Sequence, residues 1–177
     1  SVEATTEIGY SSQKDFWISS IEPVLPKVRR AVSSEQKKIS TKGRYAIRLM
    51  LDIASDKSGR PVSLKDIADR QQISEKYLEQ IISVLNKAGY VRSIRGPQGG
   101  YMLAKEPKDY TVGMLLRTTE GDLAPVSCVG NGAVECDRAD GCVTVRIWQK
   151  INDAVDNVVD NITLADLVEW QNEKKEN

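Results

Sequence analysis

Three helical patterns followed directly by a glycine-rich hairpin pattern occupy residues 40–103, and this order allows few folds. The first helix is predicted to start at Ser40 or Thr41, either of which can cap it. It should stop near Lys57, because the turn sequence of residues 58–61, Ser-Gly-Arg-Pro, follows. Its apolar residues recur with helical spacing: Tyr45, Ile47, Leu49, Met50, Ile53 and Ala54.

Two shorter helices follow the first one, separated by the polar turn of residues 71–73. Ser63 is a good N-cap for the first of them, and Ser74 is a good N-cap for the second. The second should end at Gly89, which suits the left-handed position after a helix. Their buried sides are predicted to carry Leu64, Ile67 and Ala68, and then Tyr77, Leu78, Ile81, Ile82 and Leu85.

A β-hairpin is predicted next, with strands over residues 90–94 and 101–103 and a glycine-rich turn over residues 95–100. Three helices and a hairpin, in this order, make up a winged helix-turn-helix. The predicted fold class is therefore mainly α, with a β-hairpin wing and a long dimerisation helix further on. Residues 39–106 should form the winged helix-turn-helix.

The C-terminal part continues with a helix capped by Thr111 and then a cysteine-bearing loop, together residues 107–142. Residues 143–160 are predicted to form one long amphipathic helix that pairs with its copy in a homodimer. Thr163 and Asp166 should start a short last helix, which carries Leu164, Leu167 and Trp170. The apolar side of the long helix is expected to carry Ile147, Trp148, Ile151, Ala154, Val155 and Val158.

Several classes of protein are disfavoured. No stretch approaches the roughly 20 apolar residues of a membrane span, and the apolar run at residues 16–18 is too short for a signal peptide. We therefore expect a cytoplasmic protein without membrane contact. We expect no enzyme either, because the chain has no histidine, no readable nucleophile–base pair and no phosphate-binding loop. Residues 1–38 are treated as an N-terminal extension with no assigned function.

The charge is divided unevenly, although the chain as a whole has a net charge of zero. Residues 39–106 hold 12 Lys and Arg against 7 Asp and Glu, whereas residues 107–177 hold 7 against 13. A basic half next to an acidic half favours an anionic partner for the basic half.

Double-stranded DNA is the partner that the helix-turn-helix pattern predicts. The second helix of such a motif enters the major groove, and here it begins at Ser74 and continues with Lys76. Gln80 could bind adenine, and Glu79 could accept from a cytosine amine or simply face solvent. The Tyr77 ring can pack while its hydroxyl contacts a phosphate. A dimer with two such helices about 34 Å apart would prefer a near-palindromic operator.

Arginines near the hairpin and on the first helix are the other DNA contacts that we expect. Arg95 stands at the hairpin tip, where glycines let the backbone approach a duplex closely, and Arg92 and Arg95 would meet phosphates or a narrow minor groove. Arg44 and Arg48 are expected to add phosphate contacts. Taken singly, the hairpin could be an ordinary tight turn and the polar helix face could simply be solvated. Their order along the chain and their local positive charge together favour DNA binding.

Three cysteines, Cys128, Cys136 and Cys142, lie within one short segment, and the chain has no others. An odd, clustered set favours a metal or redox site over a disulfide framework. Thiolates suit iron–sulfur clusters and zinc, which both need four ligands. The fourth ligand could be an external thiol, a backbone group or a carboxylate, or it could be missing; Glu135, Asp137 and Asp140 are the local carboxylates. An incomplete set favours a labile cluster over structural zinc, with three inert thiols as the remaining alternative.

Five short motifs resemble the IscR family of iron–sulfur cluster regulators, and the resemblance covers roughly residues 39–170. It implies a homodimeric winged helix that holds a [2Fe–2S] cluster through three cysteines and a histidine and controls genes for cluster assembly. An alternative is a metal-free regulator of cysteine or sulfur metabolism, or a zinc-stabilised DNA-binding module. The motifs lie at residues 42–46 (KGRYA), 77–80 (YLEQ), 95–97 (RGP), 99–101 (GGY) and 162–164 (ITL).

Carried over by position, the resemblance makes Cys128, Cys136 and Cys142 the cluster ligands. It makes Glu79 the position that discriminates between DNA sites. Val145 stands where the family has its histidine, and the first two cysteines are further apart than the family pattern. The DNA-reading positions that it implies are Ser74, Lys76, Tyr77, Glu79 and Gln80, with Arg95 on the wing.

Overall fold

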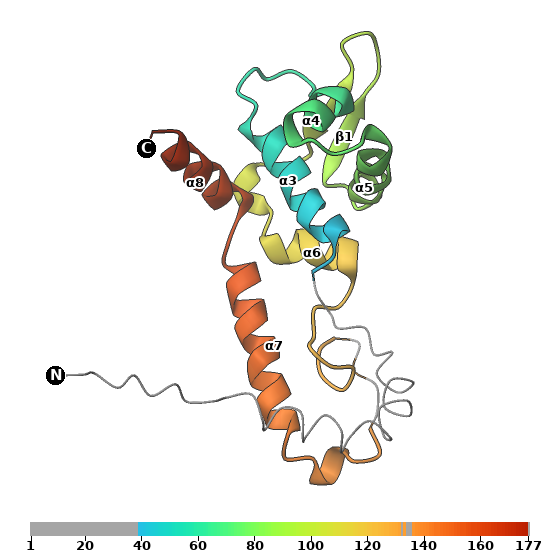
Figure 1. The fold of residues 1–177 in the computed structure, drawn as a ribbon, viewed down its shortest axis with the longest axis vertical. Coiled ribbons are helices and arrows are strands. Elements are labelled where there is room, and N and C mark those ends of the chain that lie inside the picture. Colours follow the sequence, from blue (N-terminus) through green and yellow to red (C-terminus); the bar gives the residue numbers. More distant parts are fainter. Residues whose placement is uncertain (1–38, 132, 134–135, 177) are drawn as a thin grey trace, which may run out of the picture. The chain divides into compact units, whose positions relative to one another are not determined.

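The computed structural model describes residues 39–131, 133 and 136–176, all within the second of the chain's two units, residues 37–177. The prediction for residues 1–38 lies outside the described residues. The described part is mainly helical with one antiparallel hairpin, which confirms the predicted winged-helix class (Figure 1). Its elements are α3 (Thr41–Ser55), α4 (Leu64–Gln71), α5 (Glu75–Lys87), β1 (Val91–Ile94), β2 (Gly100–Leu103), α6 (Val112–Glu120), α7 (Val145–Asp160) and α8 (Leu164–Glu176), with short 3₁₀ turns at Pro107–Asp109 and Ala139–Gly141.

Side-chain caps start α3 and α4 where the sequence predicts them. Ser40 Oγ accepts from the backbone N–H of Lys42 at 3.0 Å, and Ser63 Oγ accepts from that of Asp66 at 3.1 Å. The end of α3 comes two residues before the predicted one. Asp56 turns into an extended conformation, and its carboxylate accepts from the N–H of Ser58 at 2.7 Å, which closes a local turn.

The hairpin packs onto the helices through an extra strand-like contact that the sequence did not reveal. Val62 donates its N–H to the Tyr101 carbonyl at 2.9 Å and accepts from the Tyr101 N–H at 2.8 Å. A Cβ at Gly100 would lie 2.4 Å from the Val62 carbonyl oxygen, so only glycine fits there. Both strands end at the predicted residues, but their starts differ by one residue, since β1 starts at Val91 and β2 at Gly100.

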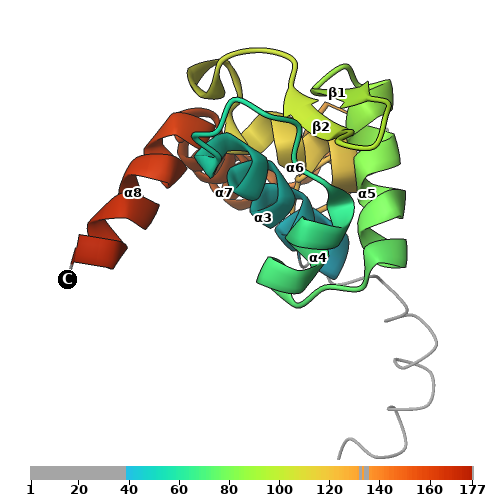
Figure 2. The ribbon, with the colours of Figure 1, turned by 90° about the horizontal axis from the view of Figure 1, so that it is seen from above.

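The buried core joins the helices of the winged helix-turn-helix to α6 and α8. Apolar residues of α3, α4 and α5 pack together with Leu115 of α6 and Leu164 of α8. In Figure 2, α5 and α8 lie on opposite sides of α3. Tyr110 is fully buried; its hydroxyl donates to the Tyr90 carbonyl at 2.8 Å and accepts from the Lys105 N–H at 2.8 Å. The loop before α6 is thereby fastened to the hairpin.

The last two helices differ somewhat in length from the prediction. α7 starts at Val145, after Thr144, and α8 runs to Glu176, so it is not short. Thr163 and Asp166 cap α8 reciprocally, as predicted: the Asp166 carboxylate accepts from the Thr163 N–H at 2.7 Å, and Thr163 Oγ1 accepts from the Asp166 N–H at 3.2 Å. Among the described helices, none has the length and apolar character that crossing a bilayer requires.

Candidate DNA-binding surface and cysteine loop

The helix-turn-helix consists of α4, a short turn and α5. Gln72 adopts left-handed dihedral angles (φ 54°) and ends α4, and buried Ile73 fixes the turn against the core. Ser74 precedes α5 as predicted, but its side chain makes no capping hydrogen bond there. The buried side of α5 holds Leu78, Ile81, Ile82 and Leu85, which confirms the predicted apolar face.

The opposite side of α5 presents the predicted DNA-reading residues together. The side chains of Ser74, Lys76, Glu79 and Gln80 are all exposed. Tyr77 is only half-buried, and its ring packs edge-to-face against Tyr45 with centroids 5.9 Å apart. The two uses expected of Tyr77 are therefore compatible, since the ring packs without being fully covered.

The wing carries Arg95 just after β1, in an exposed turn. Gly96 has a positive φ of 126°, which lets the turn reverse directly after this arginine. Arg92 is exposed on β1, opposite Met102 of β2. Both arginines are placed where a duplex could reach them.

The two arginines of α3 differ in their surroundings. Arg44 is exposed, and its guanidinium donates to Thr41 Oγ1 at 3.4 Å, one turn earlier on the same helix. Arg48 is exposed too, but it donates to the side chain of Gln71 at 3.0 Å and to its carbonyl at 2.6 Å. Arg48 thus already binds the end of α4, which its local sequence does not indicate.

A second contact that the local sequence does not indicate links the end of α6 to the start of α3. Glu120 Oε1 accepts from the Gly43 N–H at 2.8 Å and from Ser40 Oγ at 2.6 Å. A Cβ at Gly43 would lie 2.4 Å from the same oxygen. The carboxylate therefore caps α3, and its negative charge interacts favourably with the positive end of the helix dipole. The cysteine-bearing loop starts directly after Glu120.

The three cysteines have different environments in this loop. All three are free thiols; Cys136 is exposed, while Cys128 and Cys142 are partly buried. Cys142 Sγ lies 3.3 Å from Thr144 Oγ1, just ahead of α7. This hydrogen bond, supported by the backbone N–H of Val145, holds the pKa of the Cys142 thiol below its usual range.

The structure does not gather the cysteines into a ligand set. Within the described part of the chain, no three Cys, Asp or Glu side chains are grouped so that they could hold a metal ion. Asp137 and Asp140 are exposed in the same segment, and Glu135 lies outside the described residues. The predicted ligands thus stay candidates by chemistry and sequence position.

A helix-turn-helix with a polar recognition helix, flanked by a glycine-rich arginine-bearing wing, defines a winged-helix DNA-binding regulator. Residues 39–170 match the Rrf2 family, described as iron-dependent transcriptional regulators. The chain belongs to this family. The match covers the same residues as the IscR resemblance in the sequence.

Regulators named IscR and CymR are about equally similar to this chain. The Escherichia coli HTH-type transcriptional regulator IscR is 40% identical over 134 residues, 76% of this chain and 82% of the relative. The structure of T. potens IscR aligns with TM-score 0.64 and 44% identity, covering 77% of this chain and 90% of that one. The structure of CymR, the global cysteine regulator of B. subtilis, aligns with TM-score 0.64 and 42% identity, covering 75% and 97%.

Proposed function

We propose that this transcription regulator senses iron–sulfur status through a [2Fe–2S] cluster on Cys128, Cys136 and Cys142, and controls genes for iron–sulfur cluster biogenesis. The observation that carries the proposal is that every cysteine of the chain lies in one loop, which leads directly into α7, with its thiols at least partly accessible. Inert cysteines are more often buried in apolar cores. The E. coli and T. potens IscR relatives support the same reading.

The donor chemistry fits three of the four ligands that a cluster needs. Thiolates are the preferred protein ligands of iron–sulfur clusters, and the lowered pKa of Cys142 favours its thiolate form. A bound cluster would supply a group whose presence depends on iron, sulfide and oxygen. No histidine is available as the fourth ligand, since Val145 occupies the family position, so a carboxylate such as Asp137 or Asp140 or an external ligand would complete the set.

DNA binding is assigned to the exposed side of α5, to the wing and to the start of α3. Ser74, Lys76, Tyr77, Glu79 and Gln80 would contact base edges and phosphates in the major groove. Arg95 on the wing and Arg44 on α3 would contact the backbone of a near-palindromic duplex. The regulator would act in the cytoplasm, where its DNA lies, and no catalytic residue is assigned.

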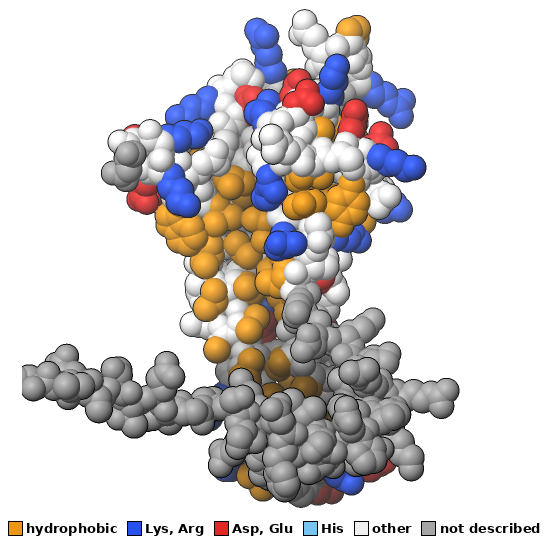
Figure 3. Space-filling model, in the orientation of Figure 1, with side chains coloured by type: hydrophobic (Ala, Val, Ile, Leu, Met, Phe, Trp, Pro, Cys, Tyr) orange, Lys and Arg blue, Asp and Glu red, His pale blue; other side chains and the backbone are white. Residues whose placement is uncertain are grey.

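We infer a homodimer through α7 because the two sides of this helix differ. One side is fixed to α6, because Arg117 forms ion pairs with Asp156 at 2.5 Å and Asp160 at 2.6 Å. The other side is an apolar stripe that the described chain leaves uncovered, with Ile147 and Val158 more than half exposed. Figure 3 shows apolar side chains over α8 and down α7. A second copy of the chain would cover this stripe, which consists of Ile147, Ile151, Ala154 and Val158.

Oxygen-free reconstitution with iron and sulfide tests the cluster. The wild type should gain visible absorbance that bleaches in air, and Cys136→Ala should gain none while keeping its oligomeric state. Val145→His is the matched variant, because it restores an imidazole at the family position and should slow the bleaching. A wild type that stays colourless under these conditions would refute the cluster proposal.

A metal-free regulator of cysteine or sulfur metabolism is the second candidate. Two observations favour it: the similarity to CymR, and the absence of a grouped ligand set among the described residues. Metal analysis of the oxygen-free protein separates the candidates. A colourless, metal-free protein that still binds DNA supports the second candidate, whereas a colourless protein with stoichiometric zinc supports a zinc-stabilised module.

A further inference from the structure

Arg48 joins α3 to the end of the first helix of the helix-turn-helix. Its Nε donates to Gln71 Oε1 at 3.0 Å, and its Nη2 donates to the Gln71 backbone carbonyl at 2.6 Å. Gln71 is the last residue of α4, and Gln72 follows it in a left-handed conformation. The planar guanidinium is thus used as a two-pronged donor, which an ammonium group cannot replace.

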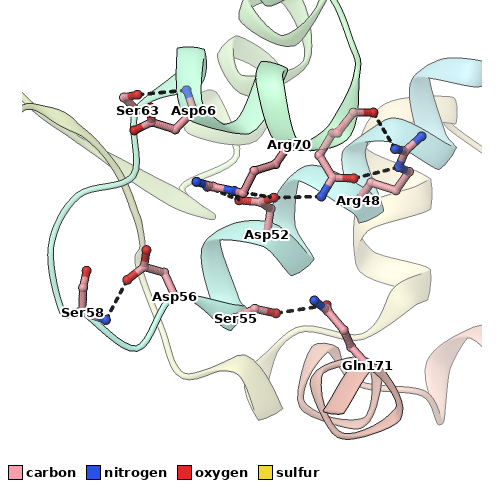
Figure 4. A network of polar contacts seen from close by, with 10 residues as sticks. Arg48, Asp52, Ser55, Asp56, Ser58, Ser63, Asp66, Arg70 and Gln171 are labelled. Carbon is pink, nitrogen blue, oxygen red and sulfur yellow. Dashed lines mark hydrogen bonds and ion pairs between the residues drawn. The ribbon is translucent and has the colours of Figure 1, made fainter. Parts of the chain in front are cut away.

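Asp52 fixes the orientation of the Gln71 amide from the other side. The Asp52 carboxylate, nearly buried, accepts from Gln71 Nε2 at 2.8 Å and forms an ion pair with Arg70 at 2.5 Å. Because a carboxylate only accepts and a guanidinium only donates, the amide nitrogen must face Asp52 and its oxygen must face Arg48. Figure 4 shows this network between α3 and the end of α4.

Arg48 also reaches the recognition helix through an aromatic pair. Its guanidinium carbon lies 5.3 Å from the Tyr45 ring centroid, within the range of a cation–π contact. Tyr45 in turn packs edge-to-face against Tyr77 in the first turn of α5, with an interplanar angle of 80°. Arg48 therefore acts on both sides of the turn that sets the position of α5.

We propose that Arg48 is a positioning residue for DNA recognition: it holds the α4–α5 turn and the Tyr77 ring in place, instead of binding phosphate itself. The proposal rests on the proposed DNA-binding surface of α5. It separates Arg48 from Arg44, four residues earlier on the same helix, whose exposed guanidinium donates to the Thr41 hydroxyl of its own helix.

Salt dependence distinguishes a positioning arginine from one that contacts phosphate. The probes are a duplex that the wild type selects from a randomised double-stranded library, and a scrambled duplex of equal length. Arg48→Ala should bind the selected duplex about tenfold more weakly, with unchanged binding to the scrambled duplex and an unchanged slope of log K against log salt. Arg48→Lys should behave like Arg48→Ala, because it keeps the charge but loses the fork.

Arg44→Ala is the matched control. Loss of a phosphate contact weakens binding to both duplexes and lowers the salt slope by about 1. The same behaviour in Arg48→Ala, with rescue in Arg48→Lys, would overturn the positioning role. So would wild-type affinity of Arg48→Ala for the selected duplex.

A double-mutant cycle with Tyr77→Phe tests the link to the recognition helix. Tyr77→Phe keeps the ring and removes only the hydroxyl, so its effect on binding should shrink at least about threefold when Arg48 is already Ala. Additive effects would overturn the proposal. A wild type that selects no duplex would overturn both the proposed DNA surface and the role of Arg48, whereas additivity alongside normal wild-type binding overturns only the latter.

Discussion

Replacing Ile151 by Asp should convert the protein from dimer to monomer. Ile151 is 40% exposed in the single chain and lies in the middle of the α7 stripe. Complete burial of an isoleucine side chain contributes about 1.5–3 kcal/mol, so covering the exposed part contributes roughly 1 kcal/mol per protomer. Two carboxylates in an apolar seam add a desolvation cost of at least about 1 kcal/mol. The total of about 3 kcal/mol weakens dimerisation by roughly a hundredfold or more.

Sedimentation equilibrium at micromolar concentration measures this change. Gln149→Asp is the control, because it places the same charge on the same helix, at an exposed position away from the stripe. It should stay dimeric, and circular dichroism should show the same helix content for both variants. Equal masses for the wild type and Ile151→Asp would refute the reasoning, since the stripe would then not be the interface.

Three further predictions concern stability and DNA. Tyr110→Phe should lower the free energy of unfolding by about 1–3 kcal/mol in urea denaturation, because the Tyr90 carbonyl and the Lys105 N–H lose their buried partner. Burial raises the pKa of Tyr110, so the wild type should lose stability as the pH rises beyond about 10, and the Phe variant should lose less. The hydrogen bond from Arg117 lowers the pKa of Asp160; its contribution is present above about pH 4 and lost in more acidic solution, so Asp160→Asn should flatten the acid limb of a stability profile. Arg95→Ala should weaken binding to a selected duplex and lower the slope of log K against log salt by about 1. An unchanged slope would mean that the wing does not contact the DNA backbone.

Local signals explain why the sequence predicts most of the helix-turn-helix. A cap such as Ser63 acts within three residues, and Gly89 adopts the left-handed conformation (φ 73°) that its place after α5 requires. The predicted end of a helix is wrong where a local hydrogen bond ends the helix earlier. The carboxylate of Asp56 accepts a hydrogen bond from the Ser58 N–H, so α3 ends at Ser55, two residues before the predicted end at Lys57.

Contacts between distant residues account for what the sequence does not predict. Arg48 has the pattern of an exposed helical arginine, and only the fold brings Gln71 within its reach. Leu164 follows the predicted dimer helix in sequence, yet it is fully buried in the core beside α3. The cysteines show the opposite case: their clustering is plain in the sequence, whereas the described structure does not group them, and the proposed cluster would have to bring them together on binding.

The cysteine loop is fastened at both ends to elements that the proposed function uses. At its start, Glu120 caps α3, the helix that carries Arg44 and Arg48. At its end, Cys142 contacts Thr144, from which α7 begins. These two contacts give a change that tightens or loosens the loop a direct route to the capped start of α3 and to α7. By linkage, whatever binds the loop and alters DNA affinity has its own affinity altered by DNA to the same extent, so the affinity of the loop for its ligand with and without duplex measures the coupling directly.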